Sequence, residues 1–123
     1  MSSIDMYMEN ILDQYKHPRN FGILEHATHK HKENNPLCGD EIEVMLIIKN
    51  GKVEDVKFMG KGCAISMASA SMLTQEIKGK SIEEVKKMTP DHILDMLGIP
   101  VGPVRLKCAL LSLEVVHKCV YSV

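Results

Sequence analysis

The residues of this sequence best suited to chemistry are its cysteines, whose thiolates bind metal ions and act as nucleophiles. Three of them, Cys38, Cys63 and Cys108, each follow a turn-forming stretch. Asp40 lies two residues after Cys38, and side chains two apart in an extended segment point to the same side. Three thiolates and one carboxylate would complete a tetrahedral site for zinc or for iron in a cluster.

The fourth cysteine and the histidines fit such a site less well. Cys119 is separated from Cys108 by about three helical turns, which is about 16 Å and too far to share an ion. We expect Cys119 to be structural, as most isolated cysteines are. His26, His29 and His31 alternate with a period of two, but the lysines between them favour a solvated polar loop over a metal-binding strand face.

The surroundings of two cysteines predict raised reactivity. Cys63 directly precedes a predicted helix, and Cys108 lies in the first turns of another. Unpaired N–H groups and the partial positive charge of a helix N-terminus favour thiolate over thiol. We therefore expect Cys63 and Cys108 to be more reactive than a free cysteine.

An antiparallel hairpin should bring the first two cysteines together. The dipeptide Asn50-Gly51 stands between the apolar, β-branched runs 41–49 and 53–58, which is the strongest short hairpin signal. Antiparallel strands bring their outer ends together, so Cys38 and Cys63 should be neighbours in space. The position of the third cysteine relative to them stays open.

The other elements are predicted to be helices and loops. Helical periodicity of apolar residues covers five segments: 3–16, 64–78, 81–88, 91–97 and 104–117. Residues 17–39 are expected to form a long loop with a short edge strand near 25–29, and the glycines of 60–62 should end the hairpin. This order of elements predicts an α+β fold with an antiparallel sheet and helices packed on one face.

Length and charge restrict the partners and the compartment. The 123 residues suit one domain, 1–123, with its own hydrophobic core. The 15 basic and 16 acidic residues give a net charge of −1, so we expect no nucleic-acid partner. No apolar run approaches the ~18 residues of a membrane span. No secretory signal is visible, so we expect no membrane attachment, a cytoplasmic location and reduced thiols.

Four motifs follow one another along the chain: YKHPRNFG at 15–22, NPLCGD at 35–40, the segment 62–81 that begins with GCAIS, and RLKCALL at 105–111. Together they resemble the U-type iron–sulfur cluster assembly proteins, which include IscU, SufU and the N-terminal domain of NifU. The resemblance covers nearly the whole chain. It implies a three-stranded antiparallel sheet with helices on one face, and a metal or cluster site on Cys38, Cys63 and Cys108 assisted by Asp40.

The chain departs from both main branches of this family. Lys107 precedes the third cysteine where IscU-type proteins have His, so the segment 105–108 is closer to SufU. The stretch 79–103 is too short for the insertion that SufU proteins carry. The run Val101-Gly102-Pro103-Val104-Arg105 stands where IscU proteins present Leu-Pro-Pro-Val-Lys to an Hsp70-type chaperone, and the lost proline argues against that partner.

The resemblance implies two alternative functions, neither of them that of a conventional enzyme. As a scaffold, the protein would accept sulfur from a cysteine desulfurase, assemble a transient [2Fe–2S] cluster on Cys38, Asp40, Cys63 and Cys108, and pass it to recipient apo-proteins. As a zinc-dependent sulfur acceptor like SufU, it would hold Zn²⁺ on the same four residues. Zn²⁺ is also expected in the cluster-free form of a scaffold. A structural zinc or thiol-free fold without a transfer role is a third alternative.

Individual roles follow from the same resemblance. Cys38 and Cys108 are the candidate sulfur acceptors, and their order stays open. Lys107 cannot bind iron while protonated, so it would stabilise a persulfide anion or the negative charge of the cluster. A solvated lysine at a helix start is the plain alternative. Three cysteines leave a coordination gap, so a homodimer bridged by the cluster is a further expectation.

Overall fold

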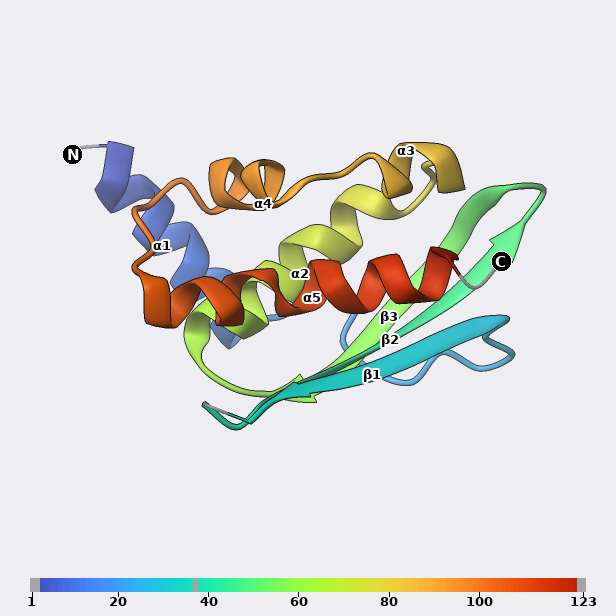
Figure 1. Cartoon of the computed structure of the whole chain (residues 1–123), viewed down its shortest axis with the longest axis horizontal. Coiled ribbons are helices and arrows are strands. Elements are labelled where there is room, and N and C mark those ends of the chain that lie inside the picture. Colours follow the sequence, from blue (N-terminus) through green and yellow to red (C-terminus); the bar gives the residue numbers. More distant parts are fainter. Residues whose placement is uncertain (1–2, 37, 122–123) are drawn as a thin grey trace.

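The computed structural model describes residues 3–36 and 38–121. Three strands and five helices lie in this part of the chain: α1 (Ser3–Lys16), β1 (His29–Asn35), β2 (Asp40–Lys49), β3 (Lys52–Lys61), α2 (Ala64–Ile77), α3 (Ile82–Lys86), α4 (Pro90–Leu97) and α5 (Pro103–Tyr121). The strands form one antiparallel sheet in the order β1-β2-β3. Helix α5 packs on β1 and β2, and α2 packs on β3, so the helices cover one face (Figure 1). The predicted α+β architecture is confirmed.

The hairpin of β2 and β3 turns at Asn50 and Gly51, as predicted. Both residues have positive φ angles, 55° and 74°, which two-residue hairpin turns require and which Asn and Gly adopt most readily. Strand β3 continues through Gly60 and Lys61, so the expectation that these residues end the strand is wrong. A Cβ atom at Gly60 would lie 2.2 Å from the carbonyl oxygen of Glu41, so glycine here permits close strand pairing.

The segment expected to be mostly loop contains a full strand, β1. It covers His29–Asn35, which is later in the chain than the edge strand expected near 25–29. Its side chains alternate between half-buried and exposed, because β1 pairs with β2 over its whole length and α5 covers one of its faces. Pairing with a buried neighbour therefore outweighs the polar composition that favoured a loop.

Helix α1 has the predicted bounds but not the predicted buried face. Ile11 and Gln14 are its buried residues within the described chain. Gln14 Oε1 accepts hydrogen bonds from Ser71 Oγ at 2.6 Å and from Gln75 Nε2 at 3.1 Å, which join α1 to α2. The other apolar residues that give this segment its helical periodicity are exposed: Ile4, Tyr7, Met8, Leu12 and Tyr15.

The later helices begin close to the predicted residues. Ser81 and Glu84 form a capping box, in which the Ser81 hydroxyl accepts the Glu84 N–H at 3.1 Å and the Glu84 carboxylate accepts the Ser81 N–H at 3.3 Å. Helix α5 continues beyond residue 117 to Tyr121, because its C-terminal turn packs in the core. None of the described helices is long and apolar enough to cross a bilayer.

The hydrophobic core lies between the sheet and helices α2 and α5. Its fully buried members include residues of every layer: Ile42, Leu46, Phe58, Leu73 and Val115. Cys119 belongs to this core, and its thiol donates to the carbonyl oxygen of Val44 at 3.7 Å. Burial, with a smaller contribution from the charge of Glu43, raises the pKa of Cys119 to about 12. This position agrees with the structural role expected for Cys119.

We predict that Cys119→Ala lowers the free energy of unfolding by about 1 kcal/mol at pH 7, because it removes a buried sulfur from the core. The loss should shrink above pH 9. The folded state holds the Cys119 proton more tightly than the unfolded chain, so the wild type loses stability as pH rises from 9.0 towards about 12. Denaturant unfolding of both metal-free proteins at pH 7 and pH 10 measures this. A loss of equal size at both pH values would contradict the assignment.

Candidate functional site

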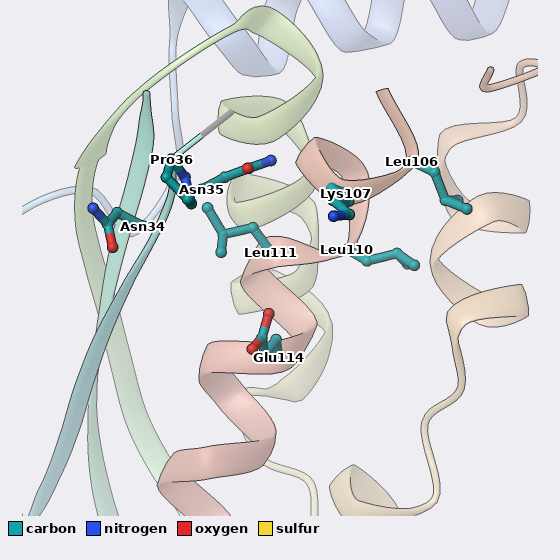
Figure 2. Close-up of a pocket in the computed structure, with 8 residues that line it drawn as sticks. All are labelled: Asn34, Asn35, Pro36, Leu106, Lys107, Leu110, Leu111 and Glu114. Atoms are coloured by element: carbon teal, nitrogen blue, oxygen red, sulfur yellow. The ribbon is translucent and has the colours of Figure 1, made fainter. Parts of the chain in front are cut away.

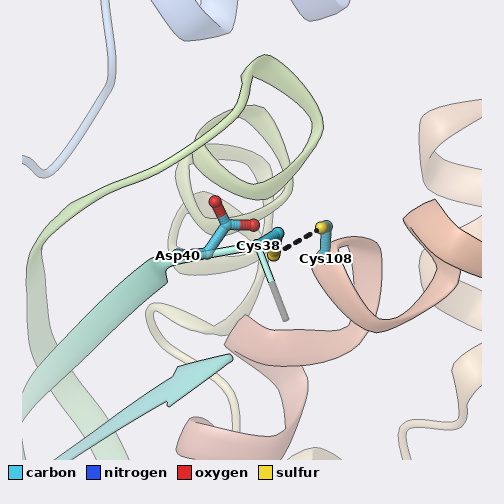
Figure 3. A group of neighbouring side chains, drawn as sticks. All are labelled: Cys38, Asp40 and Cys108. Atoms are coloured by element: carbon cyan, nitrogen blue, oxygen red, sulfur yellow. Dashed lines mark hydrogen bonds between the residues drawn. The ribbon is translucent and has the colours of Figure 1, made fainter. Parts of the chain in front are cut away.

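Cys38, Asp40 and Cys108 converge although they come from different parts of the fold (Figure 3). Cys38 lies before β2, Asp40 is the first residue of β2, and Cys108 lies in the second turn of α5. The Sγ atoms of the two cysteines are 3.1 Å apart. One ligand atom from each residue lies within 4.8 Å of the others, so the three could bind one metal ion. The docking of α5 on the sheet thus settles the position of Cys108 that the sequence left open.

Cys63 is joined to this group through Asp40. Asp40 Oδ1 accepts the backbone N–H of Cys63 at 3.0 Å, and Oδ2 lies 3.7 Å from the Cys63 thiol. Cys63 follows β3 and is the N-cap of α2, so closure of the hairpin brings it to the start of β2. Its sulfur lies outside the group whose ligand atoms are all within 4.8 Å of one another. The site therefore consists of a close group of three donors and a fourth donor beside the carboxylate.

Gly62 allows the Asp40 carboxylate to approach the backbone so closely. A Cβ atom at Gly62 would lie 2.4 Å from Asp40 Oδ1 and 2.8 Å from its Cγ, which no real contact tolerates. Asp40 is 1% exposed, and a buried carboxylate needs hydrogen-bond donors. The N–H of Cys63 supplies one only because position 62 carries no side chain.

A tight turn presents Cys38 beside Asp40. The backbone N–H groups of Cys38 and Gly39 both donate to the carbonyl oxygen of Asn35, at 3.3 and 2.8 Å. Gly39 has a φ of 74°, a left-handed conformation that glycine adopts without strain. Cys38 is exposed at this turn, whereas Asp40 and Cys108 are buried. Cys38 is therefore the thiol of the close group that a partner can reach.

The site opens to the surface through a pocket of about 370 Å³. Seven residues line this pocket, which we call the cysteine pocket: Cys38, Asp40, Gly62, Cys63, Val104, Arg105 and Cys108. All three cysteines of the predicted site reach it. Arg105 is the one basic residue among the seven.

Lys107 lies at a different pocket, between the end of β1 and α5 (Figure 2). This second pocket has a volume of about 410 Å³, and Asn35, Leu110 and Glu114 are among its lining residues. Successive residues of a helix point about 100° apart, so Lys107 diverges from its neighbour Cys108. The charge-stabilising role of Lys107 stays a prediction.

Sequence reasoning missed Arg105 as a residue of the site. A spacing of three residues places Arg105 and Cys108 on the same face of α5. That spacing was the available signal. Lys107 is adjacent to the cysteine in sequence but lies at the other pocket.

The buried position of Cys108 makes it a weak acid in the metal-free protein. Burial raises the pKa of its thiol far above the usual range, and hydrogen bonding to Asp40 and Cys38 and the charge of Asp40 raise it further. The expectation that Cys108 is more reactive than a free cysteine is therefore wrong, because desolvation outweighs the helix dipole. A metal ion must displace this proton, so the affinity of the site should rise with pH.

The Asp40 carboxyl shows the opposite shift. Its burial by itself would raise the pKa, but hydrogen bonds from Cys108, Cys38 and Cys63 outweigh this effect and lower the pKa of Asp40. The carboxylate is therefore ionised at neutral pH and available as a ligand.

The donor set fits either group that the sequence suggested. Ligand atoms around a tetrahedral zinc ion are about 3.8 Å apart, which is comparable with the spacing of Cys38, Asp40 and Cys108. Thiolates with one carboxylate suit zinc and cluster iron, and suit magnesium or calcium poorly. Cys63 would complete the set as the fourth donor.

The histidines form no comparable group within residues 3–36 and 38–121. His26 precedes β1 and has a φ of 63°, so it does not share a strand face with the others. His29 and His31 lie in β1, so the expectation of a loop is wrong for them. The His31 ring contacts the carboxylate of Glu33, with 2.8 Å between Nε2 and Oε1.

We predict that Gly62→Ala weakens zinc binding about tenfold, as displaced supporting groups of metal sites typically do, because the new methyl group displaces the Asp40 carboxylate. Gly102→Ala is the matched control, since no atom lies within 4 Å of a Cβ atom there. Neither position has a positive φ, so the backbone accepts alanine at both. Competition with a chromophoric chelator measures the affinities. Equal affinity of the two variants would show that the contact does not support the site.

Comparison with known proteins agrees with this geometry. The family of the NifU-like N-terminal domain matches residues 6–122. The zinc-dependent sulfurtransferase SufU of Bacillus subtilis (strain 168) is 41% identical over 130 residues, which cover 92% of this chain and 88% of that protein. The iron–sulfur cluster assembly scaffold protein IscU 1 of Archaeoglobus fulgidus is 34% identical over 115 residues, which cover 94% of this chain and 74% of that protein.

The fold is also shared with solved structures. The crystal structure of FiSufU from the thermophile Fervidobacterium islandicum AW-1 superposes with a TM-score of 0.83 at 28% sequence identity, and the match covers 97% of this chain and 99% of that one. The alignment with the Bacillus protein is longer than the whole 123-residue chain, so that relative has residues that this chain lacks. The resemblance seen in the four motifs is confirmed: the chain belongs to the NifU-like N-terminal domain family, with SufU and IscU proteins as its relatives.

Proposed function

We propose that this protein is an iron–sulfur cluster assembly scaffold, which accepts sulfur from a cysteine desulfurase, assembles a transient [2Fe–2S] cluster and passes it to apo-proteins. The observation that carries the proposal is the convergence of three thiols and one buried carboxylate at a single surface pocket. Relatives named as IscU scaffold proteins, at 34% and 37% identity, support it. Cys38, Asp40, Cys63 and Cys108 would hold the cargo.

Cys38 is the better placed of the two candidate sulfur acceptors. It is exposed, whereas Cys108 is 1% exposed and its raised pKa keeps it protonated. The Cys38 thiolate would attack the terminal sulfur of a persulfide on the desulfurase. The S–S bond of that persulfide breaks, the desulfurase cysteine leaves as a thiolate, and the persulfide now belongs to Cys38. Reduction of this sulfur to sulfide needs two electrons from a separate donor, and ferrous iron comes from a separate source.

Asp40 would make the assembled cluster easy to release. A carboxylate is a hard ligand and binds cluster iron less tightly than a thiolate does. The residue is held in place by the N–H of Cys63, so it can stay in position while the cargo arrives and leaves. This combination of a fixed position and a weak bond suits a transient cargo.

The partners follow from the reaction. A cysteine desulfurase would supply the sulfur and recipient apo-proteins would take the cluster, in a cytoplasm that keeps thiols reduced. Gly102 stands in place of the first proline of the Pro-Pro pair, which argues against the chaperone contact of IscU proteins. In a homodimer that shares one cluster, the second copy would supply a thiolate beyond the three cysteines of the first copy.

A zinc-dependent sulfur acceptor is the second candidate. The 41% identity to the Bacillus zinc-dependent sulfurtransferase supports it, as does the segment Arg105-Leu106-Lys107-Cys108. In this case Cys38, Asp40, Cys63 and Cys108 would together hold the zinc ion, and Cys38 would leave the metal when it takes the sulfur. Cys38 would accept the sulfur as described above, and no cluster would form.

We predict that anaerobic incubation with ferrous iron, cysteine and a cysteine desulfurase gives the charge-transfer absorbance of a [2Fe–2S] cluster. Asp40→Cys replaces the hard oxygen ligand with a soft sulfur and should lengthen the cluster lifetime in the presence of a chelator several-fold. Asp40→Ala, which only removes the ligand, should also change the lifetime. If neither substitution alters it, Asp40 does not bind the cluster. If the wild type gives no such absorbance, the scaffold proposal fails.

We also predict that a single turnover of the desulfurase adds one sulfur atom to Cys38 in most molecules, because this thiol is the exposed one. Mass spectrometry of each cysteine-containing peptide, paired with metal analysis, measures this. Cys38→Ser should abolish the modification, whereas Cys119→Ala, which changes a core thiol, should not. Tight stoichiometric zinc with strong activation of the desulfurase and no cluster transfer would favour the second candidate. Persulfide found first on Cys108 would overturn the assignment of Cys38.

A further inference from the structure

With a metal ion or cluster bound, the site would carry a net negative charge. Three thiolates and the Asp40 carboxylate supply four negative charges, whereas Zn²⁺ or an oxidised [2Fe–2S] core supplies two positive ones. The excess is the same for either candidate function. Part of it falls on Asp40 and Cys108, which are each 1% exposed, so water screens that part poorly. A nearby cation would therefore stabilise the filled site.

Arg105 is the cation in the right place. It is the one basic residue that lines the cysteine pocket, and it lies three residues before Cys108 on the same face of α5. Its guanidinium group forms no ion pair with any of the described residues. The charge is thus available to whatever fills the pocket.

The position of Arg105 works against the stability of its own helix. Arg105 is the third residue of α5, and a positive side chain there meets the partial positive charge of the helix N-terminus. The first turn contains no acidic residue that would compensate. Its backbone N–H bonds to the carbonyl oxygen of Gly102, which any residue could do. An arginine that breaks a local rule without a structural gain points to a role at the site.

We propose that Arg105 is the charge partner of this site, a positioning residue that offsets the excess negative charge of the filled ligand set. Because Lys107 lines the other pocket, the proposal assigns to Arg105 the role that the sequence predicted for Lys107. The proposal rests on the proposed function only in that the four ligands hold a metal ion or cluster. It applies equally to the scaffold and to the zinc-dependent acceptor.

Zinc affinity tests this proposal without reference to sulfur transfer. The metal-free protein is titrated with Zn²⁺ against a chromophoric chelator. Arg105→Gln should weaken binding about tenfold, as loss of a supporting group around a metal site typically does. Arg105→Lys keeps the charge and should recover most of the affinity. Lys107→Gln removes the same charge from a neighbouring position on the same helix and should stay within twofold of the wild type.

Three outcomes separate the explanations. Equal weakening by Arg105→Gln and Lys107→Gln would show a general effect of net charge and overturn the proposal. Unchanged zinc affinity of Arg105→Gln with slower sulfur transfer would assign Arg105 to partner docking and also overturn it. A shifted denaturant midpoint of metal-free Arg105→Gln, without rescue by lysine, would reveal a structural role instead. Failure of the wild type to bind zinc or a cluster would refute the proposed function, which is a distinguishable result.

Discussion

The contact between the Asp40 carboxylate and the backbone at positions 62 and 63 is the constraint on which the site depends. It ties the start of β2 to the N-terminus of α2, across the open end of the hairpin. The pairing of Glu41 with Lys61 already brings Cys38 and Cys63 close together, and this contact fixes the carboxylate beside both of them. The absence of a side chain at Gly62 therefore allows the buried Asp40 carboxylate to make this contact. Cys108, the remaining candidate ligand, reaches the site when α5 docks on the sheet.

The ionisable groups of the site differ in pKa and in exposure. The carboxylate is ionised because thiols and an amide donate to it, whereas the buried thiol of Cys108 keeps its proton until a metal ion displaces it. Cys38 is exposed and can meet a partner. The candidate ligand set thus combines an ionised carboxylate, a buried thiol with a raised pKa and an exposed thiol. This division suits both candidate functions, and relatives named for each of them are similar to this chain.

Much of the fold could be predicted from local signals, and the exceptions have physical reasons. Asn50 and Gly51 determined the hairpin, and with it the neighbourhood of Cys38 and Cys63, because a two-residue turn fixes the pairing. The position and length of strand β1 escaped prediction because its polar side chains are ordered by the neighbouring strand. The place of Cys108 depends on how α5 packs, which no local pattern encodes. The phase of α5 likewise decides that Arg105, and not Lys107, reaches the cysteine pocket.

The wide separation of the ligands along the chain has a consequence for how loading and folding are coupled. Cys38 and Cys108 are 70 residues apart in sequence and 3.1 Å apart in space. No short segment carries the site, so a nascent or damaged copy in which α5 has not docked offers cargo no complete set of ligands. If these residues hold the metal ion or cluster, only a copy with α5 docked on the sheet would bind it. A bound metal ion or cluster would in turn stabilise the docking of α5 on the sheet.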